Sequence, residues 1–188
     1  MGGGPSVRVR ASTVRVRDQF VLARYGKLSR EQYRSRVSPE LLHVLKTPGD
    51  LWVDFALFIE ATELACRLFG DGSPRLAREI GAYGAEANVG PWRSLVHRLL
   101  SPSLILEIAG MLWSHHYDGG RLVTSSPGPR TVLVRIQDFP SPHLMHCTSI
   151  EGWLERTLKF SKPRRIEVVQ ITCCGRGDAR CELRADWD

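Results

Sequence analysis

The chain has 188 residues, of which 43% are hydrophobic and 24% charged, and this composition is typical of a globular protein with one domain. The formal net charge is +6, but the arginines are spread along the chain without a recognition-helix or aromatic RNA-binding pattern. We therefore expect a solvated basic surface rather than a nucleic-acid site. No apolar run reaches the roughly 18 residues of a membrane span, and the first residues lack the apolar core of a signal peptide.

The five cysteines indicate the compartment in which the protein works. Their number is odd, two of them are adjacent, and no secretion signal accompanies them. These features argue against a disulfide framework, which forms in oxidising compartments. We expect a reducing, cytoplasmic location.

The N-terminal arm, residues 1–17, contains a stretch from 7 to 17 in which valine alternates with arginine. This pattern predicts a half-buried strand, either bulged or split in two around Ser12. Its charged face suits the edge of a sheet, and a strand at a chain end is able to reach a second copy. We therefore expect it to support a homodimer, the alternative being that it docks on its own domain.

Residues 18–116 carry apolar side chains at helical spacing and form the predicted helical half. Gly26 and Gly70 are expected to end helices, whereas Ser38 followed by Pro39 is a helix start. Helices are expected over 20–25, 54–69, 74–87, 91–100 and 104–115, with two more that begin at Ser29 and Pro39.

Residues 117–188 change character and read as two strands, a helix and two strands. The expected strands are 121–125, 131–137, 165–172 and 181–187, and the expected helix is 145–160. The fold class is therefore α+β, with a helical N-terminal half packed on an antiparallel sheet of four or five strands in a single domain of residues 1–188.

The stretch from Cys173 to Cys181 is the clearest sign of site chemistry, because it holds three of the five cysteines within nine residues. Predicted strands flank it, and Gly175 and Gly177 fit a tight turn that needs positive φ. Cys147 lies 26 residues before Cys173. We expect Cys147, Cys173 and Cys181 to converge in space.

With Cys147 at a helix start, a turn glycine at Gly177 and seven residues between Cys173 and Cys181, residues 117–188 resemble the vinyl-4-reductase type of small-molecule-binding domain. That group is related in fold to haem-NO-binding domains and to trafficking subunits of the TRAPP complex. The whole chain, with its terminal Cys-x-Leu-x-x-x-Trp strand, is also similar to a paralogous family of unknown function in myxobacteria.

In the aromatic sensors of this group, three cysteines and a glutamate hold a structural zinc, so the resemblance implies a zinc site here. Gln170 stands at the glutamate position, and glutamine is a poor zinc ligand. Cys174 or His146 is able to supply the fourth ligand instead. On a regular strand Gln170 and Cys173 face opposite sides, so their convergence requires a bulge near Thr172. The alternatives are free thiols packed in the core, or a redox disulfide.

The resemblance also implies a mostly apolar pocket between the helices and the sheet for a small apolar or aromatic molecule. Trp113, His97 and His115 are candidate lining residues, the alternatives being core packing for the tryptophan and a helix C-terminus for the histidine. The tryptophan that the aromatic sensors carry on the strand before the cysteine-bearing helix is missing from 131–137. Their phenol recognition therefore does not transfer, and no histidine is placed as a haem ligand.

The chain contains none of the common catalytic motifs of hydrolases, nucleotide-binding enzymes or metalloproteases. We therefore predict a non-enzymatic sensor or regulatory domain that passes its signal to a separate partner protein. The alternative is a ligand-free interaction or dimerisation module, as the trafficking relatives suggest. An enzyme acting on a tetrapyrrole or another ring follows only from the name of the family.

Overall fold

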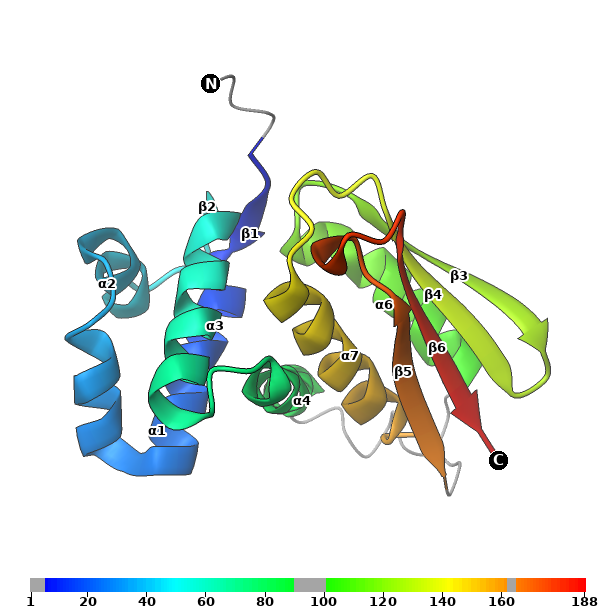
Figure 1. Cartoon of the computed structure of the whole chain (residues 1–188), viewed down its shortest axis with the longest axis horizontal. Coiled ribbons are helices and arrows are strands. Elements are labelled where there is room, and N and C mark those ends of the chain that lie inside the picture. The colour runs from blue at the N-terminus through cyan, green and yellow to red at the C-terminus, as the bar shows by residue number, and fades with distance from the viewer. Residues whose placement is uncertain (1–5, 90–100, 162–164) are drawn as a thin grey trace.

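The computed structural model describes residues 6–89, 101–161 and 165–188, and it has the predicted α+β architecture (Figure 1). The helical part lies on one side and the sheet on the other, with α4 and α7 between them. The helices are α1 (Ala11–Arg34), α2 (Pro39–Lys46), α3 (Phe55–Phe69), α4 (Arg75–Val89), α6 (Pro102–His116) and α7 (Leu144–Leu158). The strands are β1 (Arg8–Arg10), β2 (Trp52–Asp54), β3 (Arg121–Gly128), β4 (Thr131–Gln137), β5 (Ile166–Thr172) and β6 (Cys181–Trp187).

The main sheet is antiparallel, with strand order β3-β4-β6-β5. Alternate residues of the central strands, such as Val132, Val134 and Leu183, are buried, while their neighbours on the same strands face the other side. Helices α6 and α7 cover the buried face (Figure 1). The predicted β-β-α-β-β order of residues 117–188 is thus confirmed. The predicted helix over 91–100 lies outside the described residues.

The N-terminal arm differs from its prediction. Only Arg8–Arg10 form a strand, and helix α1 begins at Ala11, so the strand expected over 7–17 is wrong for most of its length. The reason is that Ala11, Val14 and Val21 recur at helical spacing, and the loop before β2 holds the start of the helix: the Ala11 N–H donates to the Leu51 carbonyl at 2.8 Å.

Strand β1 has neighbours on both edges within the same chain. It pairs antiparallel with β2, and Val9 forms a further bridge with Tyr117. The described part of β1 therefore docks on its own domain, which was the alternative to self-association. The homodimer itself stays a prediction.

Helix α1 folds back on itself at Gly26, whose φ of 85° lies in the left-handed region. Asp18, buried in the first half of the helix, accepts hydrogen bonds from the guanidinium groups of Arg30 and Arg34 in the second half at 2.5 to 2.9 Å. These charge-assisted bonds fasten the two halves across the break. The predicted helix end at Gly26 is therefore confirmed: the first helical segment ends there, and a second one continues in a new direction.

The two parts of the chain meet where α4 crosses α7 at very close range. A Cβ atom added at Gly81 of α4 would lie 1.9 Å from the Ser149 carbonyl oxygen, and one at Gly152 of α7 would lie 2.0 Å from the Arg78 carbonyl oxygen. Only glycine lets the two backbones approach this closely. The crossing fixes the position of α7 relative to the helical part.

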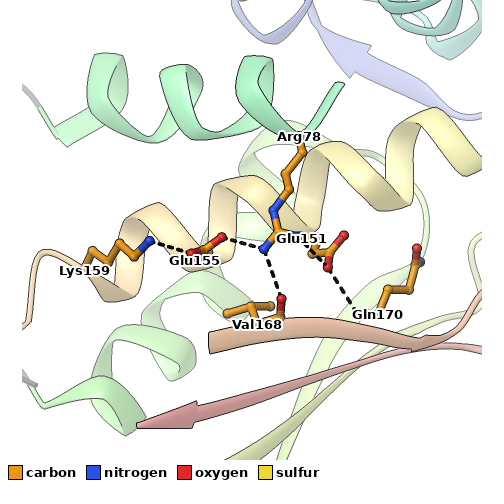
Figure 2. A network of polar contacts seen from close by, with 6 residues as sticks. All are labelled: Arg78, Glu151, Glu155, Lys159, Val168 and Gln170. Carbon is orange, nitrogen blue, oxygen red and sulfur yellow. Dashed lines mark hydrogen bonds and ion pairs between the residues drawn. The ribbon is translucent and has the colours of Figure 1, made fainter. Parts of the chain in front are cut away.

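Arg78 ties the same junction together at its edge. Figure 2 shows its side chain reaching from α4 toward α7 and β5. It bonds to the carboxylates of Glu151 and Glu155 at 3.1 and 2.5 Å and to the Val168 carbonyl at 3.1 Å. One guanidinium thus joins two helices and the edge strand of the sheet.

In the parts of the chain that the structure describes, no helix combines the length and the apolar character needed to cross a membrane.

Candidate functional site

Three buried cysteines converge as predicted: the Sγ atoms of Cys147, Cys173 and Cys181 all lie within 4.8 Å of one another. We call them the cysteine triad. Cys147 comes from the first turns of α7, Cys173 follows β5, and Cys181 begins β6. The Cys147 and Cys181 sulfurs are 3.5 Å apart. Two sulfurs bound to one tetrahedral zinc at about 2.3 Å lie about 3.8 Å apart, so the spacing of the triad suits a zinc ion.

The loop between β5 and β6 brings the triad together. The pairing register of β5 and β6 shifts between Gln170 and Thr172, so the bulge that we expected near Thr172 is present. Beyond it, the Cys173 N–H donates to the Asp178 carboxylate at 2.7 Å, which braces the turn. Gly177 has a φ of 94°, as predicted for the turn.

Gly175 has a different role from the one predicted, because its φ is not positive. A Cβ atom there would lie 2.5 Å from the Leu144 backbone nitrogen. The glycine therefore allows the loop to touch the start of α7, which carries Cys147. This close approach is what brings a helix cysteine next to the two hairpin cysteines.

The triad favours one thiolate among its members. The Cys147 thiol and the Cys174 backbone N–H both lie within hydrogen-bonding distance of the Cys181 sulfur. The hydrogen bond from Cys147 lowers the pKa of Cys181 to about 5, and the same bond, followed by burial, raises the pKa of Cys147 above its ordinary value. A bound cation would favour the thiolate forms of the cysteines that ligate it.

The three residues considered as a fourth ligand lie in different surroundings. Cys174 is half-buried and adjoins Cys181 through its backbone. Gln170 is held through its backbone N–H, which donates to Glu151 at 3.3 Å. His146 directly precedes Cys147 on α7, and its ring belongs to an aromatic cluster. Neither Cys174 nor His146 belongs to the group of mutually close ligand atoms.

His146 is fully buried, and neither ring nitrogen has a hydrogen-bond partner among the described residues. Its ring contacts five aromatic rings, with centroid distances between 5.0 and 5.9 Å. Burial in this apolar setting lowers its pKa to about 3, so the imidazole is neutral at physiological pH. A cavity of about 280 Å³, which Cys147, Cys174 and Cys181 also line, adjoins it.

A second cavity, which we call the interior pocket, lies where α1, α3, α4, α6 and α7 meet. It has a volume of about 70 Å³. Most of its lining is apolar and includes Phe58, Leu112, Trp113 and Trp153. Ser12, Thr13, Arg17, His116, Tyr117 and Ser149 supply the polar part of the wall. An apolar wall with a few convergent polar groups is the usual make-up of a small-molecule site.

The ligand-binding candidates from the sequence have different outcomes. Trp113 lines the interior pocket and is held by a hydrogen bond from its indole N–H to the Gly119 carbonyl at 3.0 Å. His115 is exposed and does not line the interior pocket, whereas its neighbour His116 does. A ligand contact of His115 stays a prediction. His97 lies outside the described residues.

Arg17 is a charged residue of the interior pocket that the sequence analysis did not single out. Its side chain is buried, and its Cζ atom lies 3.6 Å from the centre of the Phe58 ring. The signal was present in the sequence: Val14, Arg17 and Val21 share one face of a helix, and a charge on an apolar helix face is unusual. The valine–arginine alternation concealed it by suggesting a strand.

Comparison with known proteins gives structural neighbours only. No protein-family model and no curated protein matches the chain. An H-NOX protein variant from S. oneidensis in the Fe(II) ligation state matches with a TM-score of 0.69 at 15% identity, over 95% of this chain and 96% of that one. The H-NOX domain from Shewanella oneidensis in the Fe(II)CO state gives a TM-score of 0.69 at 14% identity, over 95% and 98%. The unliganded Fe(II) H-NOX protein from K. algicida gives 0.67 at 11% identity, over 95% and 96%.

These matches span nearly the whole chain, so the predicted relation to haem-NO-binding domains is confirmed at the level of the fold. The residues of the interior pocket do not suit a haem group. Pockets for drug-sized ligands span about 300–1,000 Å³, whereas this pocket has about 70 Å³. The Trp113 and Tyr117 rings, both in the pocket wall, stack on each other with their centroids 4.4 Å apart.

Proposed function

We propose that the chain is a non-enzymatic sensor or regulatory domain that binds a small molecule in the interior pocket. The observation that carries the proposal is the make-up of this pocket, an apolar chamber with a few inward polar groups at the junction of the helical part and the sheet. The H-NOX-like fold adds support at the level of architecture, since fold alone does not decide function.

Helix α7 is the element through which a bound molecule would act on the rest of the chain. Ser149, Ile150 and Trp153 on this helix line the pocket. Cys147 on the same helix belongs to the cysteine triad, and Glu151 and Glu155 take part in the Arg78 network (Figure 2). A ligand that shifts α7 therefore changes contacts with the hairpin loop and with β5, the surfaces open to a signalling partner.

We further propose that the cysteine triad holds a structural zinc ion, and that the side chain of Cys174, which lines the same cavity as Cys147 and Cys181, turns toward the metal as the fourth ligand. Thiolates are preferred zinc ligands, and a closed four-coordinate site is the usual structural form. The zinc would link the start of α7 to the β5–β6 loop, so the metal and the pocket would share one helix. Its role here would be to fix α7 rather than to carry out chemistry.

Native mass spectrometry of the purified full-length protein tests both proposals in one measurement. We expect one zinc ion per chain and a bound small molecule that is lost on collisional activation. The mass of the denatured chain is the reference for both differences. A protein that carries neither, and that binds no compound from a small-molecule library at the interior pocket, would show that the sensor proposal is wrong.

The ligand-free interaction module remains the second candidate because one edge of the sheet is apolar and exposed. Val169 and Ile171 of the edge strand β5 are 47% and 46% exposed. Edge strands with exposed apolar side chains are able to add a strand from another chain, although Arg78 and Glu151 already engage Val168 and Gln170 of β5. The same mass spectrum distinguishes the two, because a constitutive dimer without bound small molecule favours this candidate.

A further inference from the structure

Arg17 is a buried cation whose partners are all neutral. Its side chain is 3% exposed. Its Nε donates to the Thr62 hydroxyl at 3.0 Å, Nη1 to the Thr13 carbonyl at 2.7 Å and Nη2 to the Ser149 hydroxyl at 3.1 Å. These contacts hold the guanidinium plane against the Phe58 ring. They fix the orientation of the charge but do not neutralise it.

No carboxylate among the described residues balances this charge. The adjacent Asp18 is already paired with Arg30 and Arg34. The pKa of the Arg17 guanidinium is set mainly by burial, with smaller effects from Tyr117, Tyr33 and Cys66. Burial lowers the pKa of Arg17 to about 10, so the group still carries its proton at neutral pH. A buried charge without a counter-ion is costly, and proteins seldom keep one without a use for it.

The guanidinium also has unused donor capacity at the pocket wall. Arginine carries five N–H groups, and the three hydrogen bonds leave one N–H on each terminal nitrogen without a partner among the described residues. Arg17 lines the interior pocket together with Thr13 and Ser149. A group with two free N–H donors and a full positive charge is matched to a carboxylate, which is able to accept both.

We propose that the interior pocket binds a small organic acid, with the carboxylate on Arg17 and the apolar part against the aromatic wall. This inference rests on the proposed ligand-binding function and names the chemical class of the ligand. The histidine in the pocket does not supply the charge, because burial lowers the pKa of His116 and keeps it neutral. Recognition of the anion therefore falls to Arg17, with the hydroxyl groups beside it as further donors.

The size of the pocket limits the acid. A cavity of about 70 Å³ admits a carboxylate and a short apolar chain. The apolar part of a longer acid would extend out of the pocket along α6, where Leu112 lines the pocket and is 42% exposed. Phe58, Trp113 and Trp153 offer flat apolar surfaces, so a short aliphatic acid fits inside, whereas the ring of an aromatic acid would have to extend toward Leu112.

Matched acids and amides test the inference on the wild-type protein. Acetate, butyrate and benzoate are titrated against acetamide, butyramide and benzamide, and the shifts of the backbone and tryptophan indole signals are followed by NMR. Each pair has nearly the same shape and differs in charge. We expect the best acid to bind at least about tenfold more tightly than its amide, because the amide cannot form the charge-assisted bidentate contact.

Two variants then assign the preference to Arg17. Arg17→Gln is expected to lose the preference for the acid, while Arg17→Lys keeps part of it. Arg15→Gln removes a neighbouring charge that bonds to the Thr47 and Gly49 carbonyls outside the pocket, and it should bind like the wild type. If Arg17→Gln does not fold, the comparison of acid and amide on the wild-type protein still decides the question.

The outcomes separate this inference from the function on which it rests. Amides that bind at the pocket as tightly as the acids would overturn the assignment of a carboxylate and leave the sensor proposal standing. An acid preference that survives in Arg17→Gln would place the anion elsewhere and overturn it as well. If no compound of either series shifts the signals of the pocket residues and no small molecule co-purifies, both proposals fail.

Discussion

At the scale of single residues, the start of α7 separates two buried groups with opposite electrostatic needs. Cys147 belongs to the triad of sulfurs, which favours a cation. Ser149, two residues later, accepts a hydrogen bond from Arg17, which has no anion of its own. Each group is costly to bury alone, and each cost is relieved by a bound partner of the opposite charge. The residues thus predict two different occupants on either side of one helix turn.

Removal of the metal is the first prediction at this scale. Cys147→Ser should lose bound zinc and lower the melting temperature, because a structural zinc contributes directly to folding free energy. A strong chelator should lower the melting temperature of the wild type in the same direction. Cys66→Ser is the control: Cys66 is buried near Met145, away from the triad, and its loss should leave the zinc content unchanged. Equal zinc content in both variants would rule out the triad as the site.

Asp18 gives a prediction about pH. Burial alone would raise the pKa of this carboxyl, but the hydrogen bonds from Arg30 and Arg34 outweigh burial and hold its pKa below the ordinary range. A group whose pKa is depressed by folding stabilises the protein above its unfolded-state pKa of about 3.9, and this contribution is lost as the pH falls further. Stability should therefore decline below about pH 4.

The variant Asp18→Asn should remove this acid-sensitive component and cost about 2 to 3 kcal/mol at neutral pH. Breaking a fully buried pair costs about 3–5 kcal/mol, and the two arginines here are partly exposed, which reduces the loss. Urea unfolding at pH 7 and pH 3.5 measures both effects. Glu86→Gln breaks the surface pair with Arg156 and serves as the control with a smaller loss. A similar loss in the two variants would contradict the clamp.

At the scale of elements, the crossing of α4 and α7 gives a sharp comparison between two glycines of one helix. Gly81→Ala places a methyl group 1.9 Å from the Ser149 carbonyl oxygen, so the helices must separate. We expect a loss of about 3 kcal/mol or more. Gly84→Ala meets only a Val16 methyl group at 3.3 Å and gains helix propensity, so its effect should stay within about 1 kcal/mol. Thermal unfolding followed by circular dichroism compares them.

The hairpin turn between β5 and β6 gives the second comparison. Gly177 has a φ of 94°, where a β-branched side chain is strongly disfavoured. Gly177→Val should cost about 1 to 3 kcal/mol and also weaken zinc binding, because the turn carries two of the triad cysteines. Ala179→Val, at an exposed position of the same loop, should stay within about 0.5 kcal/mol. Comparable melting temperatures would show that the turn does not depend on this glycine.

The elements also explain how far the sequence predicts this molecule. Local signals were sufficient for α2, α6 and the four strands of the main sheet, because the Ser38 cap, the helical spacing over 104–115 and the alternating apolar residues act within a few positions. They were sufficient for the triad as well, since the spacing of its cysteines is set by one hairpin and one helix start. They failed at residues 11–17, where helical and strand periods overlap over a short stretch.

The interior pocket could not be predicted in the same way, because its wall is built from five helices. Arg17 and Ser149 are 132 positions apart in the chain and meet only after α7 docks across α4. His116 rather than His115 faces the pocket because of the rotation of α6 about its own axis. Neither the residue type nor the neighbouring residues in the sequence determine this rotation. Positions that depend on the docking of several elements lie beyond the reach of periodicity.

At the scale of the whole molecule, Arg78 is the link between the helical part and the sheet. Its guanidinium is 39% exposed, while the carboxylate of Glu151 beneath it is 12% exposed. Without Arg78, Glu151 keeps only the 3.3 Å bond from the Gln170 N–H among the contacts in Figure 2. Loss of the arginine therefore leaves a largely buried carboxylate, and the edge strand β5 loses the donor to its Val168 carbonyl.

The variant Arg78→Met should therefore cost about 1 to 3 kcal/mol, since methionine keeps the apolar stem and removes the charge, while partial exposure screens the pair. Hydrogen exchange should show faster exchange in β5 than in the wild type and unchanged protection in β3 and β4, because only β5 is bound by this side chain. Arg67→Met breaks an exposed pair with Glu63 within α3 and should alter neither. Uniformly faster exchange across the whole sheet would show that Arg78 supports global stability without a specific hold on β5. In that case the Arg78 network would not connect α7 to β5, and the proposed route from the interior pocket to the edge of the sheet would be broken.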